Sequence, residues 1–293
     1  MYSPSRINLL SDQEIEAIYG MPEFNKVERS LYFSVTTDEE ILLVKKYGTV
    51  KSKIHFIRLL GYFKAKQQFY KFDLGEDSHT QYILDKHFEE CQSKPSGQID
   101  SKTYQKQKSD VLLLLGFQDW LPDHELQVLP HLDELIKLYP KGHDALRQLL
   151  SYFSNQKMVL PSYRTLQDMF TNAHSRESTR LNELISALPE SIEKQLSTLI
   201  NKENGISPLN IIRLDQKNFK YTAIKMEIDK AQGISDLYDF AKGFLPSLNI
   251  SKNAIRYYAD LAEQYAASRL RRLSQSQQWL QALCFTYHRY QQI

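Results

Sequence analysis

Helical periodicity runs through almost the whole chain, and no other feature of the sequence constrains the fold as much. Apolar residues recur three and four positions apart between turn residues, which is the pattern of amphipathic helices. Ser11 followed by Glu14 forms a capping box, Pro22 suits a first helical turn, and Thr37 can cap the next helix. The helix after Pro22 should carry Phe24, Val27 and Leu31. The same periodicity predicts helices at 78–90, 101–116, 123–139, 143–156, 162–187, 190–203, 222–245, 252–273 and 275–290.

Two long helical blocks are separated by a break at residues 155–162. The chain has 293 residues, 42% of them hydrophobic, so it is long enough to build two cores. Only residues 68–74 and 210–221 could form short strands. The sequence therefore predicts an all-α protein, with an N-terminal helical domain over residues 1–158 and a second helical domain over 159–293.

Cysteine usage and apolar content indicate the compartment. The chain has two cysteines, Cys91 and Cys284, which are too few for a disulfide framework and are typical of a reducing environment. The N-terminus lacks a signal-peptide core, and no apolar run approaches the ~18 residues of a membrane span. We expect a soluble cytoplasmic protein with no membrane partner.

The charge of the chain is unevenly distributed. The sequence holds 37 basic and 35 acidic residues, for a net charge of +2. Residues 41–72, however, carry eight basic residues and no acidic one, whereas residues 11–40 are predominantly acidic. An asymmetry of this kind indicates a polyanionic partner more strongly than the net charge does.

The basic segment has the layout of a helix-turn-helix, with a tight turn at residues 47–49 between two predicted helices. On a helical wheel of the second helix, the residues on the inward face are Phe56, Leu59, Leu60 and Phe63. The residues expected to face outward are Lys51, Arg58, Tyr62 and Lys66, flanked by Lys53 and Lys64. An outward basic stripe of this kind binds DNA phosphates, and Arg58 and Tyr62 could reach base edges in the major groove.

A solvated lysine face on an ordinary core helix is the alternative to a DNA contact in this segment. The lack of any acidic residue over residues 41–72 favours the DNA contact. Lys45 and Lys46, at the end of the preceding helix, extend the predicted DNA-binding set.

Two later segments offer further candidates for DNA contact. Ser162 can cap a helix that presents Tyr163 and Arg164 at its N-terminus, where free backbone N–H groups favour phosphate. A plain capped helix with a half-buried tyrosine is the alternative there. The basic residues predicted to contact DNA in the last segment are Lys252, Arg256, Arg271 and Arg272. Arg271 and Arg272 can equally stabilise a helix C-terminus or contact a neighbouring domain.

Catalytic and metal-binding patterns are weak. The sequence has no HExxH, CxxC or phosphate-binding glycine loop, and its eight histidines are scattered. His124 and His131 are seven residues apart, but Pro130 should interrupt their helix. We therefore assign no catalytic residue, no metal ligand and no cofactor to this chain.

Five segments in order resemble the N-terminal part of the Tn-three family of replicative transposases. The segment SKIHFIRLLGYFKAKQQFY is similar to a block that the family has around a LGYFRA motif, although His55 replaces a usual glycine and Gln67 and Gln68 thin the basic tail. The other segments are LLSDQEIEAIYGMP, MVLPSYRTLQDMF, LNISKNAIRYYADLAEQYAASRLRRL and LQALCFTYHRYQQI. Together they cover most of the chain.

The resemblance implies a function. Members of the family bind the terminal inverted repeats of their transposon through helical N-terminal domains, and a separate RNase H-like domain with an Asp-Asp-Glu metal site cuts and joins DNA. We expect this chain to bind double-stranded DNA at the inverted repeats, and expect the catalytic domain, with its Mg²⁺, to lie outside it. The chain would then be a fragment or a truncated, non-catalytic remnant of a transposase.

A protein-interaction or dimerisation module is the alternative function, with a homodimer in the full-length transposase. The apolar residues that could form such a surface are Trp279, Leu280, Leu283 and Phe285.

Overall fold

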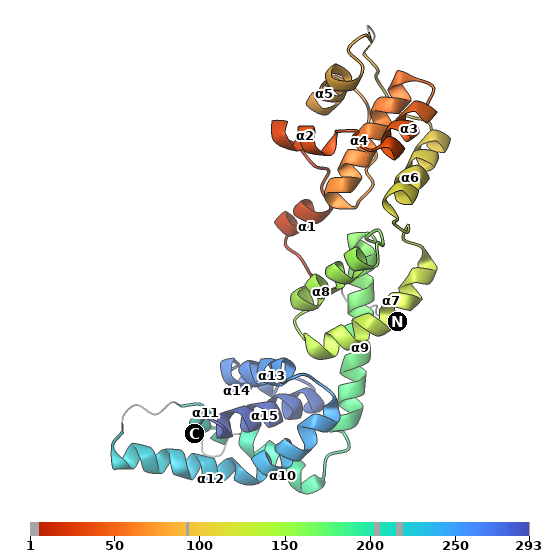
Figure 1. The fold of residues 1–293 in the computed structure, drawn as a ribbon. Coiled ribbons are helices and arrows are strands. Elements are labelled where there is room, and N and C mark those ends of the chain that lie inside the picture. Colours follow the sequence, from red (N-terminus) through yellow and green to blue (C-terminus); the bar gives the residue numbers. More distant parts are fainter. Residues whose placement is uncertain (1–5, 92–93, 202–205, 215–218, 293) are drawn as a thin grey trace. The chain divides into compact units, whose positions relative to one another are not determined.

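The computed structural model describes residues 6–91, 94–201, 206–214 and 219–292. Every regular element in these ranges is a helix, so the predicted all-α class is confirmed (Figure 1). The helices up to residue 155 are α1 (Asp12–Tyr19), α2 (Lys26–Tyr32), α3 (Asp38–Lys46), α4 (Val50–Lys66), α5 (Ser78–His87), α6 (Ser101–Leu115), α7 (Pro122–Leu138) and α8 (Gly142–Asn155). The later ones are α9 (Tyr163–Ile185), α10 (Glu190–Ile200), α11 (Pro208–Ile212), α12 (Tyr221–Phe244), η1 (Leu245–Leu248), α13 (Lys252–Gln264), α14 (Ala267–Leu270) and α15 (Gln275–Tyr290).

Side-chain caps determine where the first helices begin. The predicted caps at Ser11 and Thr37 are both present as capping boxes, with Glu14 and Glu40 as their partners. The prediction for Pro22 is wrong, because Asn25 caps α2 by accepting hydrogen bonds from the backbone N–H groups of the first turn. The helix starts later than expected, and two residues assigned to its apolar face are exposed: Val27 (77%) and Leu31 (65%).

The two predicted strands do not form in the described chain. Residues 68–74 are irregular, and Leu74 pairs with Gly97 through a single antiparallel bridge. Residues 210–212 belong to α11, and residues 215–218 of the second predicted strand lie outside the described ranges. A lone bridge of this kind fixes a loop without creating a sheet.

The contacts group the described residues into two compact units. The N-terminal unit comprises residues 6–126 and 147–168, and the C-terminal unit comprises 127–146 and 169–292. Helices α7, α8 and α9 each contribute residues to both units. The predicted domain boundary at residue 158 stays a prediction.

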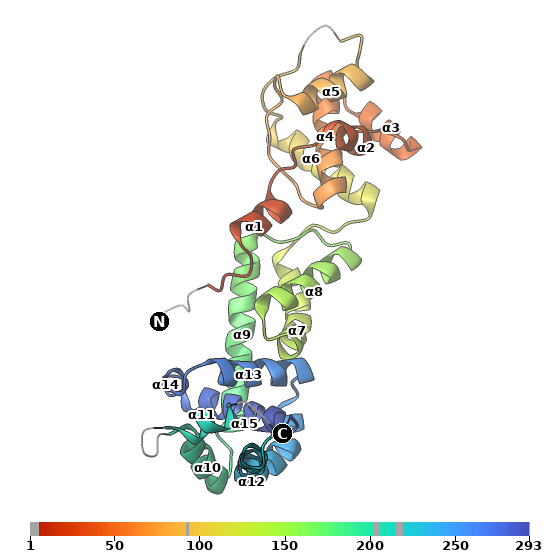
Figure 2. The same cartoon turned by 90° about the vertical axis from the view of Figure 1, so that its left-hand side faces the viewer.

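Helix α4 is the central element of the N-terminal unit. It packs against α2, α3, α5 and α6, and every residue from Ile54 to Phe63 is buried (Figures 1 and 2). Gly61 allows a close contact with the end of α2, because a Cβ there would lie 2.5 Å from the Phe33 ring. A helix that is apolar on all sides is a core helix and not a surface one.

Helix α15 occupies the corresponding position in the C-terminal unit. It packs between α12 and α13 and also contacts α10 (Figure 2). Trp279, Leu280, Leu283 and Phe285 are all buried in this core. The hypothesis that these four residues form an exposed interaction surface is therefore wrong.

None of the described helices combines the length and the apolar character that crossing a bilayer requires.

Candidate nucleic-acid interface

The basic segment has the expected helix–turn–helix chain path but not the expected exposure. Helix α3 ends at Lys46, α4 begins at Val50, and Thr49 caps α4 by accepting a hydrogen bond from the Ser52 backbone N–H at 3.2 Å. The predicted inward residues Phe56, Leu59, Leu60 and Phe63 are buried, as expected. The predicted outward direction of Arg58 and Tyr62 is wrong, because these residues are only 5% and 0% exposed.

Arg58 is held inside the N-terminal unit by partners from α4 and α5. Its Nη1 donates to Asp77 Oδ2 at 2.9 Å and to Thr80 Oγ1 at 3.1 Å, and its Nε donates to Tyr62 Oη at 2.8 Å. The guanidinium also lies 4.5 Å from the centre of the Phe72 ring. All of these groups belong to the protein, so Arg58 serves the fold and is not available to a base edge.

Tyr62 is fixed in the same network by His79. The Phe24 backbone N–H donates to His79 Nε2 at 3.0 Å, so Nε2 is the acceptor and Nδ1 carries the proton. Nδ1–H then donates to Tyr62 Oη at 2.7 Å. Burial and the nearby Arg58 charge lower the pKa of His79, which keeps the ring in this neutral form.

Three other basic residues of the segment also have partners inside the N-terminal unit. Lys64 pairs with Glu40 at 2.5 Å, Lys46 pairs with Asp110 at 2.9 Å, and Lys66 donates to the Ala17 carbonyl. Burial on its own raises the pKa of Glu40, but hydrogen bonds from Lys64 and two backbone N–H groups bring that pKa below its ordinary value. The acidic segment before residue 41 thus supplies a counter-charge for the basic one.

Five lysines take no part in these internal pairs, and we call this set the lysine surface. They lie at the end of α3, at the start of α4 and along α6, three helices that pack side by side (Figures 1 and 2). None of the five has an ion pair among the residues described, and each is at least partly exposed. This lysine surface consists of Lys45, Lys51, Lys53, Lys102 and Lys106.

The α6 half of the lysine surface, Lys102 and Lys106, was not among the predicted DNA contacts. Lys102 and Lys106 are one helical turn apart in sequence, on a helix whose buried residues are Gln107 and Val111. The spacing was a readable signal, but the contact of α6 with α4 joins segments about fifty residues apart. The α6 carboxylate Asp110 adds no free negative charge, because Lys46 and Tyr47 both contact it.

At the start of α9, one predicted DNA contact is hydrogen-bonded within the protein and the other is exposed to solvent. Ser162 caps the helix as predicted, accepting from the Thr165 backbone N–H at 3.2 Å. The Tyr163 hydroxyl accepts from the backbone N–H groups of Leu9 and Leu10, each at 3.2 Å, and the residue is half-buried. Arg164 is exposed beside it. Of these two predicted DNA contacts, only Arg164 is exposed, whereas the Tyr163 hydroxyl is already hydrogen-bonded within the protein.

The remaining predicted contacts lie in the C-terminal unit. Lys252 and Arg256 are exposed four residues apart on α13, so they share one face of that helix. Arg271 is half-buried and donates to the Ile200 carbonyl at 3.1 Å, whereas Arg272 is exposed. Arg271 therefore stabilises the C-terminus of α10, which was the alternative to a DNA contact for this arginine.

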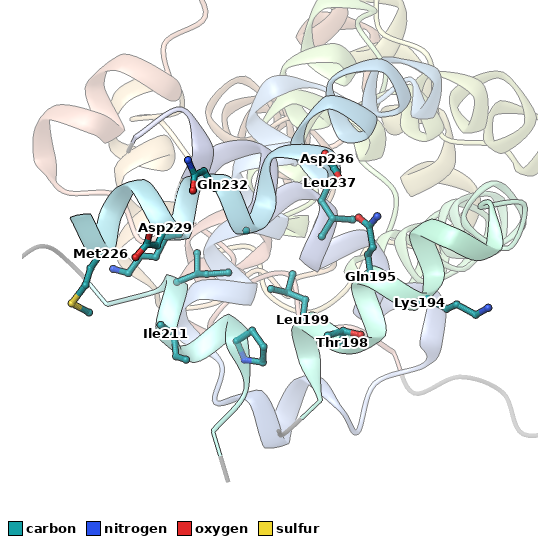
Figure 3. Close-up of a pocket in the computed structure, with 14 residues that line it drawn as sticks. Lys194, Gln195, Thr198, Leu199, Ile211, Met226, Asp229, Gln232, Asp236 and Leu237 are labelled. Carbon is teal, nitrogen blue, oxygen red and sulfur yellow. The ribbon is translucent and has the colours of Figure 1, made fainter. Parts of the chain in front are cut away.

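A cavity lies elsewhere in the C-terminal unit. It has a volume of about 630 Å³ and lies between α10, α11 and α12 (Figure 3). Leu199, Ile211 and Leu237 provide apolar lining, and the exposed carboxylates Asp229 and Asp236 stand on α12 beside it.

The described residues contain no group of three or more side chains placed to hold a metal ion. Pro130 does not interrupt its helix as predicted, because α7 continues through it from Pro122 to Leu138.

No curated protein matches the chain. Residues 9–173, more than half of the chain, match a family described as a domain of unknown function (DUF4158). This match spans the lysine surface, the Arg58 network and the start of α9. The chain therefore belongs to the DUF4158 family.

Proposed function

We propose that the chain binds double-stranded DNA through the lysine surface and forms the N-terminal, non-catalytic DNA-binding region of a Tn-three-type transposase. The observation that carries the proposal is the separation of the basic residues into two groups. Arg58, Lys64 and Lys46 have carboxylate partners within the unit, whereas the five lysines of the surface have none among the described residues. The resemblance of five sequence segments supports terminal inverted repeats as the DNA partner.

The chemistry of the lysine surface suits the phosphate backbone. Lysine ammonium groups act as compact point charges, and each phosphate that they neutralise releases condensed counterions. Such contacts position a protein on DNA without reading its sequence. Base-specific recognition would come from other side chains, since Arg58 and Tyr62 are enclosed.

A merely solvated lysine face is the alternative reading of the same helices. On such a face acidic and basic side chains are normally interspersed. Of the carboxylates on and next to these helices, Glu40 and Asp110 are paired with Lys64 and Lys46, Asp38 and Glu39 stand at the other end of α3 from Lys45, and Asp100 caps α6. This leaves an excess positive charge at one place in a unit that also holds many acidic residues.

The test compares the binding of the chain to a duplex carrying a candidate transposon end and to a scrambled duplex, over a series of salt concentrations. The variant Lys51→Gln/Lys53→Gln should weaken binding to both duplexes and reduce the slope of log K against log salt by roughly one unit per lost phosphate contact. The matched control is Lys26→Gln/Lys225→Gln, which removes the same charge at exposed positions outside the lysine surface.

Each result has a definite meaning. A preference for the transposon end that persists at higher salt supports recognition of the inverted repeat by this region. Equal and steeply salt-dependent binding to both duplexes would support phosphate contact and contradict end recognition. An unchanged slope in the Lys51→Gln/Lys53→Gln variant would exclude the lysine surface as the contact.

A second candidate function is protein interaction, and the cavity between α10, α11 and α12 favours it. Two of the apolar residues that line it, Ile211 and Met226, are exposed. The carboxylates Asp229 and Asp236 beside it have no ion pair among the described residues. Lys194 and Lys230 also line the cavity, but they pair with Glu190 and Glu227. The two unpaired carboxylates beside an apolar floor complement an amphipathic helix that has basic flanks.

A pair of labelled model helices tests this second function. The two peptides share an apolar face and differ only in having lysine or glutamate on their flanks. We expect the chain to bind the lysine peptide more tightly, and expect Asp229→Lys/Asp236→Lys to reverse that preference. Equal binding of both peptides, or none, would count against the interaction function.

A further inference from the structure

A second, smaller cavity lies in the N-terminal unit, next to the lysine surface. Its volume is about 310 Å³, at the lower end of the range for small-molecule sites. It is formed by the middle of α4, the loop after α4 and the first turn of α6. The side chains that the argument uses are His55, Lys71, Phe72, Asp73 and Tyr104.

His55 brings a fixed hydrogen-bond acceptor to this cavity. The residue is only 2% exposed, and its Nδ1 lies 2.6 Å from Gln107 Oε1. Gln107 Nε2 donates to the Ser52 carbonyl at 2.8 Å, so Oε1 is the end of the amide that faces the ring. Nδ1 must therefore carry the proton, and Nε2 is left as an acceptor with no partner among the described residues.

Burial maintains the neutral form of this ring. It lowers the pKa of His55, and the charges of Arg58 and Lys51 lower it further, which outweighs the opposing effect of the hydrogen bond that His55 donates to Gln107. His55 lines the cavity, so Nε2 is open to it, and an amino group of a ligand there would take the place of water.

Two aromatic rings line the same cavity. Phe72 stacks on His55 with ring centres 4.5 Å apart, and Tyr104 meets His55 edge-on at 6.1 Å. Phe72 and Tyr104 are both only partly buried, so part of each ring remains accessible. Together with the polar side chains of Asp73 and Gln105, they offer flat apolar walls and hydrogen-bonding groups in one small space.

Positive charge lies close to this cavity. Lys71 lines it directly, and Lys102 follows the lining residue Ser101 on α6. Lys51 Nζ lies 3.6 Å from the position of a Cβ on Gly97, the residue before the lining Gln98. Two members of the lysine surface therefore sit next to segments that form the cavity, where they can hold a phosphodiester chain.

We propose that this cavity receives a single unpaired nucleobase of the bound DNA. The base would lie against Tyr104 and Phe72 and direct an amino group toward His55 Nε2, while its flanking phosphates contact Lys51, Lys71 and Lys102. The inference rests on the DNA binding proposed above and adds to it a preference for DNA with one extruded or overhanging base.

The ligand chemistry follows from the lining. A free phosphate inside the cavity is disfavoured, because the Asp73 carboxylate lines it. An apolar chain is disfavoured because it would leave the His55 acceptor unpaired. A planar ring with an exocyclic amine satisfies both the aromatic walls and the acceptors, as bases do in proteins that bind unpaired nucleotides.

The experiment measures binding of the whole chain to three duplexes of the same sequence. One is fully paired, one carries a one-nucleotide adenine overhang, and one carries an abasic residue in place of that adenine. We expect the adenine duplex to bind about tenfold more tightly than the abasic one, since stacking on aromatic side chains supplies most of the difference. Placing 2-aminopurine at the overhang should also give fluorescence quenching on binding.

Two variants and one control assign the effect to the cavity. Tyr104→Leu should bring adenine binding down to the abasic level without changing binding to the paired duplex. Asp73→Asn changes an exposed residue, so it should fold normally and weaken only the adenine preference. The control Asp85→Asn removes the same charge at an exposed position on α5, and it should leave all three affinities unchanged.

The outcomes separate this inference from the function on which it rests. Equal binding of the adenine and abasic duplexes would overturn the base site, while salt-dependent binding lost in Lys51→Gln/Lys53→Gln would leave the DNA-binding function standing. An adenine preference that persists in both Tyr104→Leu and Asp73→Asn would overturn the assignment to this cavity. If no duplex bound at any salt concentration, both proposals would be wrong.

Discussion

Arg58 and Asp77 form an ion pair with Nη1 and Oδ2 2.9 Å apart, and this pair joins the middle of α4 to the cap of α5. The same Asp77 caps α5 by accepting from the backbone N–H groups of His79 and Thr80. One carboxylate therefore starts one helix and neutralises the buried arginine of another. This double use explains why a basic residue in a positively charged segment is enclosed and not presented to a partner.

Replacing Asp77 should destabilise the fold. Asp77→Asn leaves the Arg58 guanidinium buried without a full counter-charge and weakens the α5 cap. Because the Asp77 side chain is 38% exposed, water screens part of the loss, and we expect a decrease of about 2 kcal/mol in the free energy of unfolding. Urea denaturation measures it, with the exposed Asp85→Asn as the control. A stable Asp77→Asn variant with impaired DNA binding would instead place Arg58 at the DNA.

The buried histidines should make the protein less stable in mild acid. Burial lowers the pKa values of His55 and His79 in the folded state below 6.5, the ordinary value that applies in the unfolded chain. As the pH falls through 6.5, the unfolded chain binds protons that the folded chain does not, so stability is present above this pH and is lost below it. Each such histidine contributes a slope of up to about 1.4 kcal/mol per pH unit.

Urea unfolding at pH values from 8 to 5 checks this pH dependence. His79→Asn removes one of the histidines whose pKa burial lowers, a set that also includes His87 and His174, so the decrease in stability per pH unit should be smaller in this variant, although it starts from a lower stability. A wild-type unfolding free energy that stays constant between pH 7 and pH 5 would contradict the neutral, buried form of these rings.

A glycine in the middle of α4 should not tolerate a methyl group. Gly61→Ala would place its Cβ 2.5 Å from the Phe33 ring and 2.8 Å from the Tyr32 carbonyl oxygen. Alanine favours helices by up to about 1 kcal/mol over glycine, but overpacking of this severity costs about 1–3 kcal/mol, so we expect net destabilisation. Gly48→Ala is the control, because no atom lies within 4 Å of a Cβ there. Equal melting temperatures for the two variants would contradict the close packing of α4.

Local signals in the sequence predicted much of the fold, because capping boxes and apolar periodicity act within a few residues. The starts of α1, α3 and α9 follow from Ser11, Thr37 and Ser162 in this way. The start of α2 differs from the prediction, because Asn25 and not Pro22 marks the beginning of that helix. Helix type and position are thus readable where one residue caps the next turn.

The candidate site was harder to predict because it depends on contacts between distant segments. A helical wheel gives the relative angles of side chains on α4 but not the number of neighbours that cover the helix. Arg58 is enclosed by Asp77, Thr80 and Phe72, none of which lies on α4. The sequence did contain one sign that α4 is buried on all sides. The ten residues from Ile54 to Phe63 are apolar or aromatic except for His55, Arg58 and Gly61.

Lysines in the same segment should separate into two functional classes. Lys64→Gln removes the partner of the buried Glu40, so it should lower stability by about 1–3 kcal/mol and leave the salt dependence of DNA binding unchanged. Lys53→Gln should leave stability within about 0.5 kcal/mol and reduce the salt slope by roughly one unit, because Lys53 has no ion pair among the described residues. Denaturation and a salt titration of DNA affinity measure the two properties in parallel. If Lys64→Gln reduced the salt slope as much as Lys53→Gln, the internal pairs would not distinguish structural lysines from DNA-binding ones, and the division on which the proposed function rests would be wrong.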